Sequence, residues 1–210
     1  MLGADDTGEA ISTTHEGDSG RTRLGGHGEV SKTDARVVAY AECDEANAAV
    51  SVAIAGGALP MPIVSMLASV QNDLFDLVTD LSDPVSGDSD ARIHEEHIQR
   101  LDRAIDHFAQ EASDLSGMVL PGGTLAAALL YQARGVVRRA ERTVWAAIEA
   151  YPDQLNPLTA RYLNRLSMLL FVIARGANVE HGDVLWVPEA SARAMAAESG
   201  ESRAGDTQAG

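Results

Sequence analysis

The longest uncharged stretch of the chain, residues 46–72, constrains the fold more than any other feature. Its length would suit a membrane-spanning helix, but Gly56-Gly57 lies in its middle, and Pro60 and Pro62 follow closely. Glycine pairs and prolines interrupt a helix, so the stretch cannot be one continuous span. The sequence therefore predicts the end of one helix and the start of the next, which meet at a turn.

The composition limits what the core can be built from. Hydrophobic residues make up 45% of the 210 residues, which is enough to bury a core and excludes wholesale disorder. Aromatic residues make up only 4%, so the core must consist of Ala, Leu, Val, Ile and Met. Such side chains favour helices that pack closely on small residues, and no segment shows a convincing period-two strand pattern.

Apolar residues recur at helical spacing in five segments, which predicts an all-α five-helix bundle. The first helix is expected to begin at an N-cap near Asp34 and to end at Gly56-Gly57, with Val37, Val38, Ala41 and Ala48 as its apolar positions. The other helices are expected over residues 62–81, 90–113, 123–150 and 157–178. We expect one domain over residues 14–187, with a nucleotide loop at 14–32, a strap at 184–187, and disordered tails at 1–13 and 188–210.

Charge excludes two classes of partner. The chain has 31 acidic and 16 basic residues and a net charge of −15. We therefore expect no cationic surface that could bind nucleic acids or anionic membranes. Its one cysteine, Cys43, allows no intrachain disulfide and indicates a reducing compartment. The N-terminus has no secretory signal pattern, so we expect a cytoplasmic protein.

The fourth predicted helix carries an unusual row of arginines. Arg134, Arg138 and Arg142 are four residues apart and share one helix face, where like charges repel. One interpretation is three separate salt bridges to acidic neighbours. The other is a site for a polyanion, such as a triphosphate or a carboxylate, because guanidinium groups bind both. Glu141 beside the row could orient a guanidinium or help to hold a metal ion.

Other candidate groups are less specific. The glycine-rich loop at residues 17–28, followed by Lys32, could cradle phosphate oxygens or be a flexible tail. Asn164, within an apolar helix, could satisfy a backbone partner or contact a nucleotide. His94 and His97 are three residues apart, but a solvated polar face explains them better than a metal site.

Six motifs occur in a specific order along residues 14–188. They are Gly17-Asp18-Ser19-Gly20, Val30–Val37, Cys43-Asp44-Glu45-Ala46-Asn47, Val119-Leu120-Pro121-Gly122-Gly123, Val136–Arg142 and Tyr162–Ser167. Together they resemble the PduO-type ATP:cob(I)alamin adenosyltransferases, a family of trimeric five-helix bundles. The resemblance implies transfer of the 5′-deoxyadenosyl group of ATP to cob(I)alamin, with release of triphosphate.

The resemblance also implies the site residues. It places ATP between two subunits, with Mg²⁺, against Thr14, Gly17, Asp18, Thr22, Lys32, Arg138, Glu141, Arg142 and Asn164. Arg138 and Arg142 have the catalytic role of stabilising the triphosphate that leaves, and Glu141 is a candidate for contact with the metal ion.

The same resemblance implies a homotrimer, in which Asp44 of one subunit pairs with Arg134 of the next. Cobalamin is the second substrate, and Met118 and Met168 lie on its side of the site. A flavin reductase and a cobalamin-dependent mutase are the implied protein partners.

Several positions depart from the family pattern. His15 and Glu16 replace a basic residue and a threonine, and Glu29 replaces a basic residue. Met118 stands where the family has a phenylalanine that crowds the lower face of the corrinoid, and Met168 stands where it has an aspartate. The alternative function is therefore a low-activity or non-catalytic homologue that binds ATP or cobalamin as a carrier or sensor. A structural bundle without a ligand is the third possibility.

Overall fold

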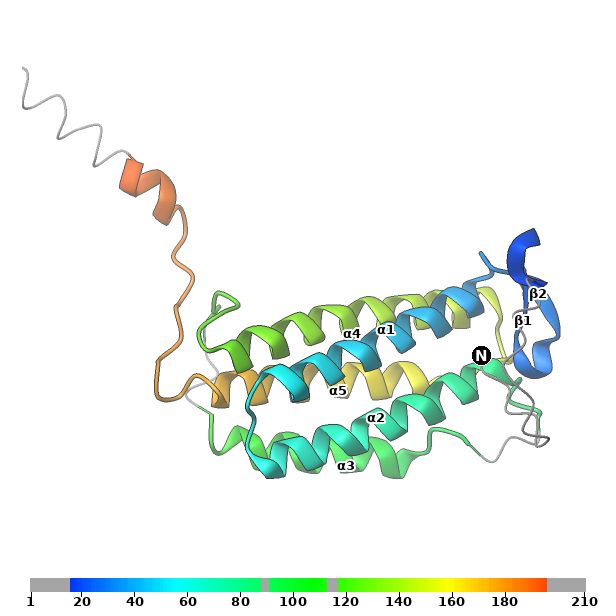
Figure 1. Ribbon diagram of the computed structural model, residues 1–210, viewed down its shortest axis with the longest axis horizontal. Helices are drawn as coiled ribbons and strands as arrows, with labels where there is room; N and C mark the ends of the chain where they lie inside the picture. Colours follow the sequence, from blue (N-terminus) through cyan, green and yellow to red (C-terminus); the bar gives the residue numbers. More distant parts are fainter. Residues whose placement is uncertain (1–15, 88–90, 113–116, 196–210) are drawn as a thin grey trace, which may run out of the picture.

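A computed structural model describes residues 16–87, 91–112 and 117–195, and five long α-helices dominate it (Figure 1). They are α1 (Ala35–Gly56), α2 (Met61–Ser82), α3 (Glu95–Ala109), α4 (Leu125–Ala150) and α5 (Leu158–Gly176). The predicted bundle is confirmed, and Asp34 is the N-cap of α1, with its carboxylate accepting from the Arg36 N–H at 2.9 Å.

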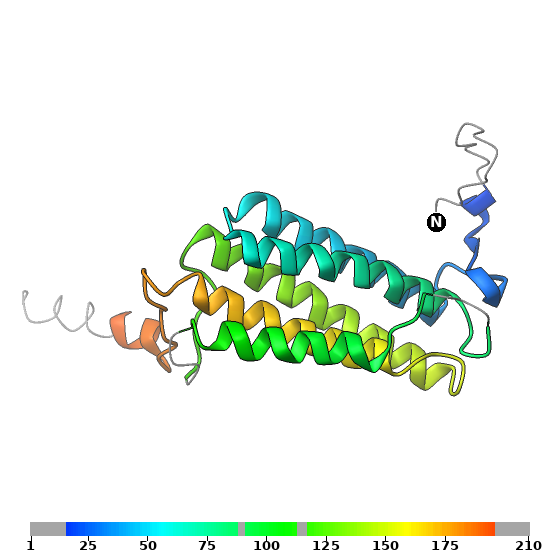
Figure 2. The ribbon, with the colours of Figure 1, turned by 90° about the horizontal axis from the view of Figure 1, so that it is seen from below.

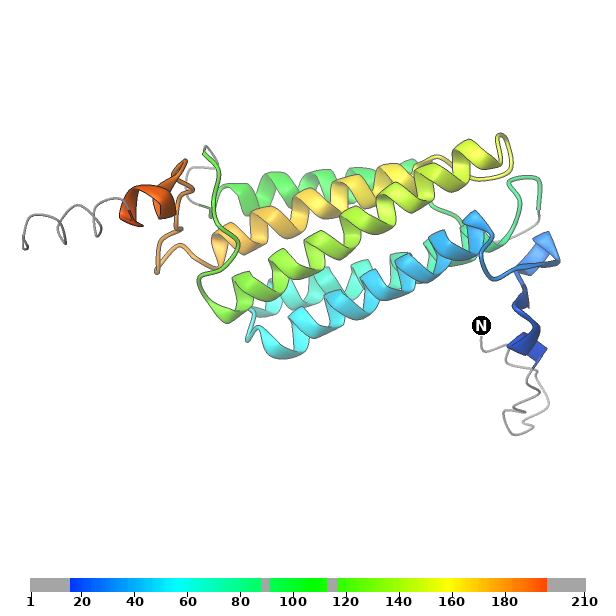
Figure 3. The same ribbon diagram turned by 90° about the horizontal axis from the view of Figure 1, so that it is seen from above.

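The helices run along a common axis. α4 packs against α1 on one side and α5 on the other, α2 packs against α1, and α3 packs against α5 (Figure 2; Figure 3). α4 therefore lies at the centre of the arrangement. No helix in the described part of the chain has the length and apolar character needed to cross a membrane.

The prediction of a chain without strands is wrong near the N-terminus. Strands β1 (Arg21–Arg23) and β2 (Glu29–Ser31) pair antiparallel; the 3₁₀ turn η1 (Glu16–Ser19) precedes them and the 3₁₀ turn η2 (Gly25–His27) connects them. Each strand has three residues, which is too short for a period-two pattern to be visible in the sequence. This hairpin lies at the end of the bundle, beside the start of α1 (Figure 1).

α1 and α4 pack against each other, and we call their fully buried small and branched side chains the seam. The seam consists of Ala39, Cys43, Ala46, Val50 and Ala53 on α1 and of Ala127, Leu130, Ala133, Val137, Ala140, Val144 and Ala147 on α4. The residues follow one another at steps of three and four, the spacing of helices that pack nearly parallel with interlocking side chains. Small side chains at these positions allow the two helix axes to lie close together.

The seam lies on a different side of α1 from the predicted one. Val38 is 39% exposed, and Ala41 and Ala48 are also exposed. The prediction followed the larger apolar residues, whereas the buried face is made mostly of alanines, which give a weak hydrophobic signal. Cys43 is buried as expected, and burial raises the pKa of its thiol well above the ordinary value.

Asn178 joins the end of α5 to the turn that precedes α4. Its Oδ1 accepts from the Thr124 N–H at 3.0 Å, and its Nδ2 donates to the Gly122 carbonyl at 2.9 Å and to Asp183 Oδ1 at 3.0 Å. Gly123 has φ +95°, and a Cβ there would lie 2.3 Å from Asn178 Oδ1. Only glycine fits this position, for both backbone and packing reasons.

The predicted strap is confirmed as a short backbone pairing. The Leu120 N–H donates to the Val184 carbonyl and the Trp186 N–H to the Met118 carbonyl, both at 2.8 Å. Beyond the strap, residues 190–195 are helical, so the tail predicted as disordered from residue 188 begins with ordered structure. Alanine, arginine and methionine are good helix formers, which explains the short helix. The rest of both predicted tails lies outside the described residues.

Asp80 on α2 accepts hydrogen bonds from two of the segments that connect the helices. Its carboxylate is fully buried and accepts from Arg92 Nη1 at 2.7 Å, from the Ile93 N–H at 2.9 Å and from Asn156 Nδ2 at 2.7 Å. Because Ile93 is held here, α3 begins only at Glu95, later than the predicted residue 90. The same carboxylate thus fixes the segment before α3 and the segment before α5.

We predict that Asp80→Ala lowers the free energy of unfolding by about 3–5 kcal/mol, because it removes the only carboxylate among the described residues that pairs with the largely buried Arg92 guanidinium and leaves it with backbone carbonyls alone. Chemical denaturation followed by circular dichroism measures the change. The matched control is Asp106→Ala, which removes an exposed carboxylate from α3 and should change the free energy by less than about 0.5 kcal/mol. Equal effects of the two substitutions would contradict the role of Asp80.

Candidate functional site

The arginines of α4 divide into one that is paired and three that are not. Arg139 donates to Glu42 Oε2 at 2.5 Å and pairs with Glu45, both on α1, and these contacts raise the pKa of its guanidinium. Arg134, Arg138 and Arg142 have no ion-pair partner within the described residues. The single chain therefore does not show the three separate salt bridges that one interpretation of the row predicts.

The row winds around α4 rather than following it straight. Steps of four residues advance about 400°, so each arginine is turned by about 40° from the one before. Arg134 and Arg138 line one cavity of about 390 Å³, and Arg142 is exposed outside it. The other lining residues are Asp102, Ile105, Asn164, Arg165, Ser167, Met168 and Phe171.

A chain of hydrogen bonds crosses the wall of this cavity from α3 to α4. Asn164 Nδ2 donates to Glu141 Oε1 at 3.1 Å, and Arg165 Nη1 donates to Asn164 Oδ1 at 3.0 Å. Arg165 Nε in turn donates to Asp102 Oδ1 at 2.9 Å. The predicted residues Glu141 and Asn164 are thus in direct contact. Asp102 was not predicted, because nothing in its local sequence shows that α3 borders the site.

Arg134 is a partly buried cation of the cavity. Its guanidinium lies over the ring of Phe171, 5.3 Å from the ring centre, and its Nε is buried without a hydrogen-bond partner among the described residues. Burial, and then the neighbouring charge of Arg138, lower its pKa. A cation in such a place is stabilised by any anion that reaches it.

The N-terminal loop is closed on itself around Gly17 and Lys32. The Lys32 N–H donates to the Gly20 carbonyl at 2.9 Å, and a Cβ at Gly17 would lie 2.7 Å from Lys32 Nζ. Glycine at position 17 therefore lets the lysine side chain cross the loop. Asp18 is exposed within η1, and Thr22 lies at the centre of β1, opposite Val30.

Thr14 and His15 lie outside the described residues, as does the side chain of Glu16. Glu29, a departure from the family pattern, forms an ion pair with Arg21 across the hairpin. The negative charge at position 29 is therefore balanced within the loop itself.

Within the described residues, no hydrogen bond or ion pair joins the loop to the arginines. The hairpin lies past one end of the bundle (Figure 1), whereas Arg138 is 12 residues, or about 18 Å, before the end of α4 at Ala150. One chain thus carries the two predicted halves of the ATP site at separate places.

Asp44 and Arg134 are also apart in the single chain. Asp44 is on the outer side of α1, where it lines a cavity of about 660 Å³ with Tyr40 and Phe75. The Phe75 side chain is 63% exposed, and burial of the carboxyl raises the pKa of Asp44. No residue in the described part of the chain forms a salt bridge with Asp44.

The two methionines assigned to the cobalamin side lie on different elements. Met168 of α5 is 49% exposed and lines the arginine cavity. Met118 is 69% exposed in the segment before α4, where its carbonyl holds the strap. Leu120, Val184, Leu185 and Trp186 are each about half exposed beside it, so Met118 is part of an apolar surface.

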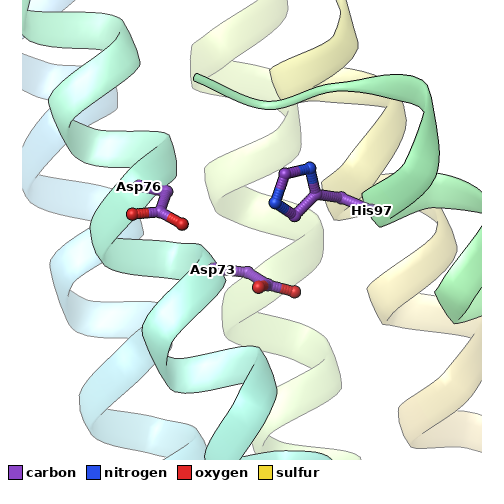
Figure 4. Close-up of side chains that lie close together, drawn as sticks. All are labelled: Asp73, Asp76 and His97. Carbon is purple, nitrogen blue, oxygen red and sulfur yellow. The ribbon is translucent and has the colours of Figure 1, made fainter. Parts of the chain in front are cut away.

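A separate group of possible metal ligands lies between α2 and α3. One ligand atom each of Asp73, Asp76 and His97 lies within 4.8 Å of the others (Figure 4). Asp73 already accepts from the Tyr162 hydroxyl at 2.7 Å and pairs with Arg100, and His97 Nδ1 accepts from the His94 N–H at 3.0 Å. Asp73 and His97 therefore already have hydrogen-bond partners within the protein. His94 is not part of this group, and the interpretation of His94 and His97 as a solvated polar face stays a prediction.

The arrangement suits the binding of a polyphosphate. Two arginines without an ion pair among the described residues, a third paired with Asp102, and an oriented asparagine line one cavity, and a lysine crosses a glycine loop elsewhere on the same chain. Guanidinium and ammonium groups stabilise phosphate charge, especially where neighbouring surfaces exclude water. These residues can position a polyphosphate and stabilise its charge.

Comparison with known proteins identifies the family. The family profile described as cobalamin adenosyltransferase matches residues 12–177. A corrinoid adenosyltransferase of Mycobacterium tuberculosis (strain ATCC 25618 / H37Rv) is 49% identical over 178 residues, which cover 83% of this chain and 92% of the relative. The corrinoid adenosyltransferase PduO of Salmonella typhimurium is 35% identical over 88% of this chain and 54% of its own length.

Solved structures agree with the sequence relatives. A variant PduO-type ATP:corrinoid adenosyltransferase from Lactobacillus reuteri, complexed with cobalamin and ATP, superposes with a TM-score of 0.75. It is 32% identical, and the match covers 82% of this chain and 97% of that one. The chain therefore belongs to the cobalamin adenosyltransferase family and is of the PduO type.

Proposed function

We propose that this protein transfers the 5′-deoxyadenosyl group of ATP to cob(I)alamin. The observation that carries the proposal is the cavity of α4 and α5, where Arg134 and Arg138 stand without ion-pair partners in the described structure beside the oriented amide of Asn164. The family of the chain and its relatives agree with this function. Cytoplasmic location fits the single, buried cysteine.

The reaction forms a cobalt–carbon bond and breaks the bond between C5′ and the triphosphate oxygen. Cob(I)alamin, the second substrate, supplies the electron pair, and triphosphate leaves with the pair of the broken bond. Arg138 and Arg142 stabilise the negative charge of the leaving group, and Lys32 and the glycine loop hold the phosphates. Mg²⁺ arrives with ATP, and Glu141 is the carboxylate that we propose faces it. A flavin reductase and a cobalamin-dependent mutase are the proposed protein partners.

We also propose that the site is completed between subunits of a homotrimer. The loop of one chain would meet the arginine cavity of the next, since the two do not meet within one chain. A contact between two different surfaces that repeats around a threefold axis closes into a ring. Pairing of Asp44 with Arg134 across this contact would relieve two groups whose charged forms burial disfavours.

The first prediction concerns ATP. Arg138→Ala and Arg142→Ala should each weaken ATP binding by about 2–4 kcal/mol, because each removes a guanidinium from phosphate in a site that a neighbouring subunit covers. Isothermal titration calorimetry measures the change. Arg139→Ala is the matched control on the same helix, since that residue is paired with α1. Unchanged affinity for ATP in both test variants would show that the arginine row has only a structural role.

The second prediction concerns assembly. The wild-type protein should sediment as a trimer at micromolar concentration, and Arg134→Ala should dissociate it because Asp44 loses its partner. Asp44→Arg alone should also dissociate it, whereas Asp44→Arg combined with Arg134→Asp should restore the trimer. Arg161→Ala, which removes an exposed pair with Glu95, is the control. A monomeric wild type would exclude the intersubunit site.

The third prediction concerns Met118. A methionine fills part of the volume of a phenylalanine but lacks a rigid ring to keep water and the lower ligand away from cobalt. We expect measurable but weak activity and a small four-coordinate population of bound cob(II)alamin, with Met118→Phe raising both. Electronic spectra with ATP present measure that population. A full four-coordinate signal in the wild type would show that the site is not weakened.

A further inference from the structure

The N-terminal loop is attached to the bundle through a buried arginine. Arg36, in the first turn of α1, is 8% exposed, and its Nη2 donates to Asp34 Oδ2 at 2.8 Å. Its guanidinium lies 3.8 Å from the centre of the Tyr151 ring, and the Tyr151 hydroxyl donates to the same carboxylate at 2.8 Å. The hydrogen bond from Arg36 holds the pKa of Asp34 well below its ordinary value. The Arg36 guanidinium is therefore held in place by residues outside the loop.

The loop contact of Arg36 is His27. Arg36 Nη1 lies 3.2 Å from His27 Nδ1, and since an arginine can only donate, the ring nitrogen must be an unprotonated acceptor. His27 Nε2 is buried without a hydrogen-bond partner in the described structure. This contact can thus form only with the neutral ring. Protonation would place N–H against N–H and bring two cations together.

Three further features hold the same turn against the bundle. The Gly26 N–H donates to Asp83 Oδ1 at 2.7 Å at the end of α2, and Leu24 is 3% exposed. Gly25 approaches Ser82 so closely that a Cβ there would lie 2.4 Å from its carbonyl oxygen. The turn η2 is therefore pressed against the bundle, with His27 as its titratable contact.

We propose that Arg36 and His27 form a latch that positions the N-terminal loop for ATP, and that protonation of His27 opens it. The inference rests on the proposed placement of ATP against this loop. Arg36 and His27 are positioning residues: they act through Gly17 in η1 and Lys32 directly after β2, which lie on either side of the hairpin that carries His27.

The charges around His27 give the direction of the pH effect. It is faced by the Arg36 guanidinium, the carboxylates of Asp83 and Asp34, and the backbone of Leu81, and burial followed by Arg36 lowers its pKa on balance. A histidine whose pKa is lowered in the closed state favours that state above its ordinary pKa of about 6.5. Below that pH the open loop binds the proton more tightly, so the latch weakens as pH falls.

The test compares His27→Asn with wild type at pH values on either side of about 6.5. Asparagine can place Oδ1 where Nδ1 accepts from Arg36, and it does not titrate. ATP affinity of the full chain is measured by calorimetry, and KM for ATP and kcat in an anaerobic assay. Between pH 7.5 and 5.5 we expect wild-type affinity to fall about 10-fold more than that of His27→Asn, with kcat at saturating ATP unchanged. His27→Ala should bind ATP weakly at both pH values.

Two controls separate the possible failures. His107→Asn removes an exposed histidine on α3 and should follow the wild type at both pH values. Lys32→Ala tests the loop as an ATP site: unchanged affinity there would overturn both the placement of ATP and the latch. If Lys32→Ala weakens ATP but His27→Asn follows the wild type with pH, the latch alone is wrong. Thermal unfolding of each variant at both pH values shows whether the loop effect is separate from a loss of the fold.

Discussion

The close approach of α1 and α4 is the constraint on which the rest of the structure depends. Alanines at steps of three and four, with Cys43 and small branched residues between them, let the two axes lie close without aromatic side chains. A larger residue at Ala46 or Ala140 would separate the helices, since both positions are fully buried. With one face of α4 fixed against α1 and another against α5, the direction in which its arginines point is also fixed.

This geometry divides the charges of the chain between two surfaces. Arg139 faces α1 and is neutralised there, whereas Arg134 and Arg138 face a cavity in which the described chain offers them no ion pair. Asp44 stands on the opposite outer side of α1 with a similarly unbalanced charge. Arg138 and Asp44 are exposed, so water screens their charges, whereas the partly buried Arg134 has a guanidinium Nε without a hydrogen-bond partner among the described residues. An anionic ligand, or the carboxylate of another subunit as proposed above, would stabilise this cation most.

The sequence predicts the helices well because their signals are local. Asp34 marks the start of α1 and Gly56-Gly57 marks its end. The buried face of α2 contains several leucines at helical spacing, so its hydrophobic pattern is strong. The sequence does not predict the buried face of α1, because small alanines rather than large apolar side chains form it. Nor does it predict strands that are only three residues long. Of the candidate site, Glu141 and Asn164 are joined by a hydrogen bond because α4 and α5 pack against each other, and their contact with ATP stays a prediction. Asp102 and the His27–Arg36 contact depend on which elements become neighbours, and no spacing along the chain encodes that.

The joint at Gly123 has a consequence for how this family varies. The space that a side chain would need at position 123 is filled by the amide of Asn178, which in turn is held by Thr124 and Asp183. One network of contacts therefore joins positions 123, 178 and 183 and links the turn before α4 to the strap. We expect the residues at these positions to change together among relatives. The two glycines of the Leu-Pro-Gly-Gly signature are thus explained by this joint, without a role in catalysis. A relative could lose the arginines of α4 and still keep these glycines, so recognition by the signature alone identifies the scaffold and is silent about turnover.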